Sequence, residues 1–194
     1  MNPSCEQDLN PADRPQGARI AHSSQPHATV SHGAADLVVR TDYLVADPRM
    51  VRDLHTAGVP HLPVRVRDGT GLVGPLVIPG VTSCLGCADL HRSDRDGAWP
   101  AIAAQLRDTV GVADRATLLA TAALALSQVN RVIAAVRGRE TVPDPAPPPA
   151  LNATLEFDIN AGSIVARQWT KHPLCSCVHP VVGRSTTRGV NRHG

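Results

Sequence analysis

The chain has 194 residues, of which 42% are hydrophobic and 19% charged, and its formal net charge is +2. That length suffices for one ordinary domain, and the near-neutral charge excludes a strongly basic nucleic-acid-binding protein. Two Trp, one Tyr and one Phe are too few for a surface on which bases stack, so the core must be built from small aliphatic side chains. A core of this kind benefits from a covalent or metal crosslink.

The N-terminal residues 1–33 are rich in Pro, Ser, Gln, Asn and His and show little periodicity, which predicts a disordered arm. His22, His27 and His32 recur at five-residue intervals, which suit neither a helix face nor a strand face, so we expect exposed histidines rather than a metal site. The first residues lack the basic start and apolar run of a secretory signal, which favours a cytoplasmic protein.

Order is expected from residue 34 onward. Residues 35–40 contain the contiguous apolar run Leu37-Val38-Val39, which is typical of a buried strand. Asp47 as N-cap, Pro48 in the first turn and Gly58 at the end predict a helix. Residues 61–67 and 72–78, joined by the turn 68–71, predict a hairpin whose prolines belong at edge positions or bulges.

The second half of the chain alternates helices with strands. A short helix is expected over 100–106 and a long one over 114–137, with an Ala-rich face that allows close packing on a sheet. The apolar residues of the long helix recur every three or four positions: Leu118, Ala122, Leu126, Val129, Ile133 and Val136. The longest apolar stretch, 116–126, is much shorter than the about 20 residues that span a bilayer, so we expect no transmembrane helix.

A proline-rich segment, 141–150, predicts an extended linker that either acts as a spacer or contacts a proline-binding partner. Strands are then expected over 151–158 and 163–169, around a turn at 159–162. The Arg- and Gly-rich residues 179–194 predict a disordered tail.

Four of the five cysteines fall into two tight pairs, Cys84 with Cys87 and Cys175 with Cys177, while Cys5 stands alone. In a reducing compartment this pattern favours a metal over disulfides. Two pairs brought together by folding can complete a tetrahedral shell of four thiolates around Zn²⁺, and such a closed shell is structural rather than catalytic. We expect both pairs at strand ends, so that the ion joins the two ends of the domain.

Other interpretations of the cysteines stay open. Cys84 and Cys87 fit the spacing of a redox-active pair, although this would leave the second pair unexplained. Four unrelated buried thiols are another possibility. His172 and His179 flank the second pair, where either could replace a cysteine as ligand.

The motifs together resemble the ThiF-like, ubiquitin-activating-type adenylating enzymes, and in particular the branch that assists azoline cyclodehydratases in modifying ribosomal peptides. The resemblance covers about residues 34–178. It is carried by the strand 36–42 that ends in Thr41-Asp42, the run 74–80 leading through Thr82 into 84–92, the long helix from 114, and the closing segment 172–177.

This resemblance implies an α/β fold with a Rossmann-like sheet, a zinc ion on Cys84, Cys87, Cys175 and Cys177, and ATP-dependent activation of a carboxylate or cyclisation of a backbone amide. It also implies that Asp42 helps to hold the Mg²⁺ of a bound nucleotide. Members of the family carry a glycine-rich phosphate loop before this half, whereas residues 1–33 contain only Gly17 and Gly33. We therefore expect a partial fold that lacks the nucleotide-binding half.

Two functions follow from these expectations. The first is a zinc-stabilised, non-catalytic scaffold or peptide-binding partner of a modification enzyme, with no role for nucleic acid or membrane. The second is an ATP-dependent adenylating or cyclodehydratase subunit whose nucleotide-binding half comes from another chain or from upstream coding sequence, so enzymatic activity stays open. A half fold also exposes apolar surface at its sheet, which predicts a homodimer or another covering partner.

Overall fold

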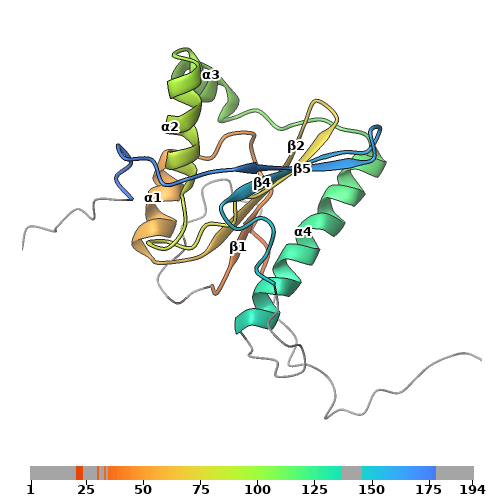
Figure 1. The fold of residues 1–194 in the computed structure, drawn as a ribbon, viewed down its shortest axis with the longest axis horizontal. Helices are drawn as coiled ribbons and strands as arrows, with labels where there is room; N and C mark the ends of the chain where they lie inside the picture. Colours follow the sequence, from red (N-terminus) through yellow and green to blue (C-terminus); the bar gives the residue numbers. More distant parts are fainter. Residues whose placement is uncertain (1–20, 24–29, 31–32, 34, 137–145, 178–194) are drawn as a thin grey trace, which may run out of the picture.

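The computed structural model describes residues 21–23, 30, 33, 35–136 and 146–177 (Figure 1). Most of the predicted arm, residues 137–145 of the linker region and the tail from 178 lie outside the described residues, as do Cys5, His27, His32 and His179. His22 is described and is exposed, as expected.

A five-stranded sheet forms the centre of the fold, in the order β1-β2-β3-β4-β5. β1 runs parallel to β2 and the other neighbours are antiparallel, so the sheet is mixed. The strands are β1 Val38–Arg40, β2 His61–Arg67, β3 Thr70–Val73, β4 Ala153–Asp158 and β5 Ser163–Gln168. The helices are α1 Pro48–Thr56, α2 Leu85–Arg95, α3 Trp99–Leu106 and α4 Arg115–Val136. The architecture is consistent with a partial Rossmann-like fold.

The two faces of the sheet meet different helices. Gly71 of β3 lies against Thr121 of α4, whereas the next residue, Leu72, lines a cavity together with Leu85 and Ala88 of α2. Because successive residues of a strand point to opposite faces, α4 covers one face and α2 the other (Figure 1).

The first predicted elements are confirmed, with differences at their ends. α1 begins where expected, and Asp47 accepts a hydrogen bond from the backbone N–H of Arg49 at 2.6 Å. Gly58 ends it at a φ of +67°. β1 is shorter than the predicted strand, and Val39 is 42% exposed because this strand lies at the sheet edge and not in its buried centre.

The predicted hairpin is present. Of the two places expected for its prolines, edge positions or bulges, Pro63 does not occupy an edge. β2 lies between β1 and β3. Pro63 pairs with Arg40 of β1 on one side. On the side of β3, its carbonyl accepts a hydrogen bond from the Gly74 N–H at 2.8 Å. The second strand ends at Val73, five residues earlier than expected, because Gly74 turns the chain at a φ of +99°.

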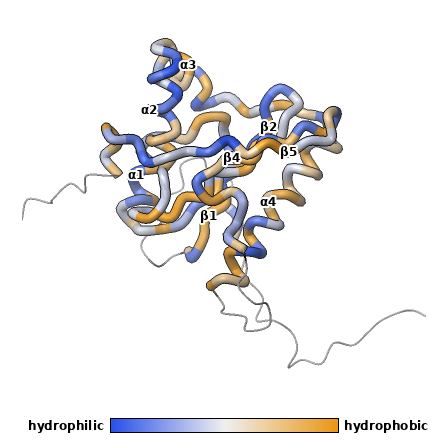
Figure 2. The backbone as a smooth tube through the Cα atoms, in the orientation of Figure 1, coloured by the Kyte–Doolittle hydropathy of each residue, from blue (hydrophilic) through white to orange (hydrophobic). Residues whose placement is uncertain are grey.

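Small aliphatic side chains make up the core, as the composition predicted. One buried cluster fills the space between the sheet and α4: Leu62, Val64, Val73, Leu76, Ala125, Ala150 and Leu155. Figure 2 shows hydrophobic residues both in the strands of the sheet and along α4.

The long helix α4 turns an unexpected face to the sheet. Its fully buried residues are Thr117, Thr121, Ala125 and Gln128. Only part of the predicted apolar stripe meets the core: Val129 packs against the core cluster, whereas Leu118 is 48% exposed and Leu126 58%. Short side chains allow the helix to approach Gly71 closely, and Gln128 Oε1 accepts the Ala150 N–H at 3.1 Å, which holds the segment before β4 in place. Leu118, Leu119 and Leu126 stay exposed, while Leu124 packs against the core cluster.

By length and composition alone, Arg115–Val136 could cross a membrane, since its most apolar window has a mean hydropathy of 1.5. In this structure, however, α4 packs on β2 and β3 through a face that includes the polar residues Thr117, Thr121 and Gln128. Of this apolar window, 17% is buried.

The close approach of α4 to β3 predicts that Gly71→Ala destabilises the fold by about 2 kcal/mol, since overpacking a filled site costs this much. An added methyl group would lie 2.1 Å from Oγ1 of Thr121, which is buried and donates to the Thr117 carbonyl at 2.6 Å. Urea unfolding measures the effect, with Gly97→Ala as control because nothing lies within 4 Å of its added methyl group. If Thr121→Ala does not relieve the effect of Gly71→Ala, the contact is not its cause.

Candidate metal centre

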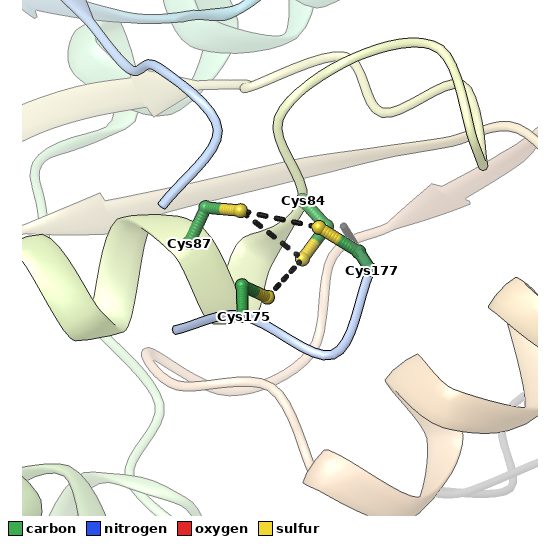
Figure 3. Close-up of side chains that lie close together, drawn as sticks. All are labelled: Cys84, Cys87, Cys175 and Cys177. Atoms are coloured by element: carbon green, nitrogen blue, oxygen red, sulfur yellow. Dashed lines mark hydrogen bonds between the residues drawn. The ribbon is translucent and has the colours of Figure 1, made fainter. Parts of the chain in front are cut away.

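The four paired cysteines lie together at one end of α2 (Figure 3). Cys84 is the N-cap residue of α2, and Cys87 lies in the first turn of the helix. Cys175 and Cys177 come from the loop after β5. The expected position of the first pair at a strand end is therefore wrong, because α2 begins directly after Cys84.

Sulfur-to-sulfur distances within the cluster match a tetrahedral metal site. Cys84 Sγ lies 3.8 Å from Cys87 Sγ and 3.4 Å from Cys175 Sγ, and Cys87 Sγ lies 3.3 Å from Cys177 Sγ. Four sulfurs at about 2.3 Å from a zinc ion stand about 3.8 Å apart at tetrahedral angles. The donor set and its spacing thus fit a thiolate-bound Zn²⁺.

Burial makes these thiols hard to ionise without a cation. It raises the pKa of Cys84, which is 4% exposed, and raises the pKa of Cys177 to about 12 with the help of its contact with Cys87. Burial also disfavours the thiolate of Cys87, but backbone hydrogen bonds from His172 and Cys84 outweigh this and lower its pKa. A bound divalent cation would supply the charge that stabilises four thiolates here.

Besides flanking the cysteines, His172 fastens their loop to α2. It is 3% exposed, and its Nε2 lies 2.9 Å from Asp94 Oδ2. Its Nδ1 accepts the Leu174 N–H at 3.2 Å, so the ring proton sits on Nε2 and is donated to Asp94. His91 stands beside it with the ring centroids 4.8 Å apart. His172 therefore positions the cysteine loop, and its ring lies outside the cluster of four sulfurs.

Asp42, the residue that the resemblance links to a nucleotide's metal ion, follows the end of β1. Its carboxylate forms an ion pair with Arg40, and its side chain is 27% exposed. Its position after a parallel strand agrees with the motif, while its role in holding Mg²⁺ stays a prediction.

Sequence reasoning missed one glycine pattern. Gly69, Gly71 and Gly74 have the Gly-x-Gly-x-x-Gly spacing of a phosphate loop. In the structure, Gly69 lies in the β2–β3 turn, Gly71 in β3 and Gly74 just after β3. A phosphate loop joins a strand to a helix N-terminus, so a hairpin cannot provide one.

A second feature that the sequence did not reveal is a cavity between the sheet and α2, opposite α4. Its lining includes three arginines, Arg65, Arg67 and Arg92, and a single acidic residue, Asp89. We call it the arginine cavity. The signal in the sequence was the alternation at residues 64–67, which places both arginines of β2 on the same face.

Comparisons with protein families and with curated proteins gave no match to this chain. Solved structures do match. E. coli MccB with ATP superimposes with a TM-score of 0.50 at 20% identity, over 73% of this chain and 39% of MccB. MccB with selenomethionine MccA gives a TM-score of 0.51 at 18% identity, over 73% of this chain and 38% of MccB. A heterocyclase in complex with substrate and cofactor gives a TM-score of 0.57 at 18% identity, over 75% of this chain and 21% of the heterocyclase.

At these identities the likeness concerns the fold. The chain spans two fifths or less of the length of each of these proteins. In fold, the chain is similar to part of the ThiF-like adenylating and cyclodehydratase enzymes, as its motifs indicated.

Proposed function

We propose that this protein is a zinc-stabilised, non-catalytic scaffold or peptide-binding partner in the modification of ribosomal peptides, acting in the cytoplasm. The observation that carries the proposal is the fold, which is similar to part of MccB, solved with MccA, and of a heterocyclase solved with its substrate. The proposed functional class is thus taken from enzymes that act on peptides. This chain resembles only part of each of those enzymes.

The proposed zinc ion would be held by Cys84, Cys87, Cys175 and Cys177. It would link the start of α2 to the loop after β5, two segments about 90 positions apart in the chain. A shell of four cysteines leaves no open coordination position, so the ion supplies stability and a fixed loop geometry.

One observation supports the non-catalytic role. The glycines with phosphate-loop spacing lie in a hairpin, which does not offer the backbone N–H cradle that a nucleotide's phosphates need.

Metal content and ATP binding measured on one purified sample test this proposal. We expect one zinc per chain by atomic emission, and no heat of ATP binding by calorimetry with Mg²⁺ present. ATP binding at micromolar concentration would contradict the non-catalytic role, and a metal-free, fully folded protein would contradict the zinc centre.

The second candidate, an ATP-dependent subunit completed by another chain or by upstream coding sequence, is favoured by Asp42. This residue stands at the end of a parallel strand with part of its carboxylate exposed. If this function is correct, a chain with a glycine-rich nucleotide-binding half must restore ATP hydrolysis on mixing, and Asp42→Asn must abolish it.

Self-association is expected through the outer face of α4. Leu119 is 65% exposed and Leu126 58%, and residues 116–130 carry no charge. Such a face is costly to leave in water and has no charges that oppose pairing with a second copy. The sheet also exposes apolar side chains at its two edge strands, as expected: Val39 of β1 and Ile164 and Val165 of β5.

Light scattering tests the self-association. We expect a dimer that dissociates in Leu119→Glu and Leu126→Glu but persists in Val112→Glu, which changes an 82% exposed residue before α4. A monodisperse monomer of the unaltered protein would contradict the prediction.

A further inference from the structure

Arg65 stands out because its charged group lacks a partner. It lies in the middle of β2, opposite Leu72 of β3, and both residues line the arginine cavity. Arg65 makes no hydrogen bond and no ion pair with any residue in the part of the chain that the structure describes. Partial burial makes such a guanidinium costly, since it has lost water without gaining an acceptor.

The surroundings of Arg65 increase this cost. Burial lowers the pKa of Arg65 to about 10, and the charges of Arg92, Arg67 and Arg40 act in the same direction. Asp89 is the acidic group that opposes them. An anion entering the cavity would therefore meet an excess of positive charge.

Asp89 is already committed to other partners. Its Oδ1 accepts from Arg92 Nη1 at 2.9 Å and from Trp99 Nε1 at 3.3 Å. Arg92 is further held between two rings, 5.0 Å from the centroid of Trp99 and 4.7 Å from that of Trp169. Arg92 and Asp89 are thus held in place by each other and by the two tryptophans. Neither of them pairs with the guanidinium group of Arg65.

Three arginines against one acidic residue give the lining a formal charge of +2. The remaining walls are largely apolar and include Leu44, Leu72 and Leu85. A single free guanidinium fork matches a planar carboxylate in two parallel hydrogen bonds. The apolar walls suit the aliphatic stem that carries such a carboxylate in a peptide.

We propose that the arginine cavity binds an acidic side chain of a peptide, with Arg65 as the residue that contacts the carboxylate. The inference deepens the proposed peptide-binding role and rests on it. Arg67 is an exposed residue of the cavity lining, and its Nε lies 3.9 Å from a carboxylate oxygen of exposed Asp68. It adds electrostatic attraction for the carboxylate but does not set the position of the ligand.

The test uses the full chain and a terminally blocked peptide, Ala-Ala-Glu-Glu-Ala-Ala, whose only anionic groups are its two side chains. The matched control peptide carries Gln in place of Glu. Binding is followed by calorimetry and by tryptophan fluorescence, because Trp99 lines the cavity. We expect saturable binding of the Glu peptide that weakens with added salt, and none of the Gln peptide.

Two variants of Arg65 and one control variant locate the contact. Arg65→Gln is expected to weaken binding at least about tenfold, and Arg65→Lys to recover part of it, since a charged hydrogen bond is worth this much. Arg167→Gln removes an exposed arginine that pairs with Glu156 outside the cavity lining, and it should bind as the unaltered protein does.

Inorganic phosphate serves as the competing source of negative charge. Binding of phosphate without binding of the Glu peptide would overturn the proposal, as would equal binding of the Glu and Gln peptides or unchanged binding by Arg65→Gln. If Arg65→Gln fails to fold, the difference in binding between the Glu and Gln peptides, measured on the unaltered protein, tests the proposal. A sample with one zinc per chain, no ATP binding and no peptide binding would refute this inference and leave the scaffold role standing.

Discussion

Removing the metal from the four-cysteine centre is expected to lower the melting temperature of the protein by at least about 10 °C. Zinc in small folding modules contributes about 10–16 kcal/mol of apparent binding energy, and a domain with a hydrophobic core of its own recovers only part of this as stability. A loss of about 3 kcal/mol already produces a shift of this size in a domain of this length. Calorimetry with and without a strong chelator measures it.

Single substitutions should reproduce the effect of the chelator. Cys84→Ser removes a buried ligand that approaches both Cys87 and Cys175, so it should lose zinc and melt at the temperature of the chelated protein. Cys5→Ser is the matched control, because Cys5 lies outside the two pairs in sequence and should leave zinc content and melting temperature unchanged.

This experiment also separates the metal from the redox alternative. The helix-start position of Cys84 and Cys87 is one that redox-active pairs use, so the structure keeps that alternative relevant. Four zinc-bound thiolates should resist alkylation until the chelator is added. Fast alkylation of the native protein, or a reversible disulfide between Cys84 and Cys87, would exclude the structural zinc centre.

Acid should destabilise the protein through His61. This side chain is fully buried, its Nδ1 lies 3.1 Å from the Val59 carbonyl oxygen, and its Nε2 has no hydrogen-bond partner in the described structure. Burial lowers the pKa of His61 to about 4, with smaller contributions of the same sign from His55 and Arg40, while the bond to Val59 acts in the opposite direction.

The direction of the effect follows from proton binding. Above the unfolded pKa of 6.5 both states hold a neutral His61 and the folded state suffers no penalty. As the pH falls from 6.5 toward about 4, the unfolded chain takes up the proton and the folded chain does not, so stability declines. The difference corresponds to roughly 3 kcal/mol when it is fully developed.

Urea unfolding at a series of pH values between these limits measures this loss. His61→Gln removes the titrating group and keeps a donor for Val59, so its stability should fall less steeply with acid than that of the unaltered protein. His22→Gln, at an exposed position, is the control and should retain the full slope. Equal slopes for all three proteins would show that His61 does not titrate as its burial predicts.

Most of the elements could be predicted because their signals are local. Asp47 and Pro48 start α1 through interactions within one turn, and Gly58 ends it by accepting a positive φ. The two turns that join β2 to β3 and β4 to β5 lie where their residues favoured them. The helix α2 was missed, since its sequence lacks a regular apolar period and a side-chain cap.

The face that each element buries could not be predicted. Apolar periodicity in α4 pointed to Leu118 and Leu126, yet Thr121 and Gln128 are the buried residues. The reason lies in the partner: Gly71 leaves room for a close helix only where the helix has short side chains, and the periodicity of one helix carries no information about that partner.

The sequence by itself determined that four cysteines in two close pairs were available as ligands, and that the motifs around them resemble part of a known fold. Pair spacing and residue type are local properties, and a thiolate's preference for zinc does not depend on the fold. Only the tertiary structure decided that Cys84 meets Cys175 at a sulfur distance of 3.4 Å and Cys87 meets Cys177 at 3.3 Å. It also decided that Arg65 lines a cavity without a hydrogen-bond or ion-pair partner in the described part of the chain. Both results depend on how the strands of the sheet are ordered, because contacts between distant segments exist only once the sheet brings them together.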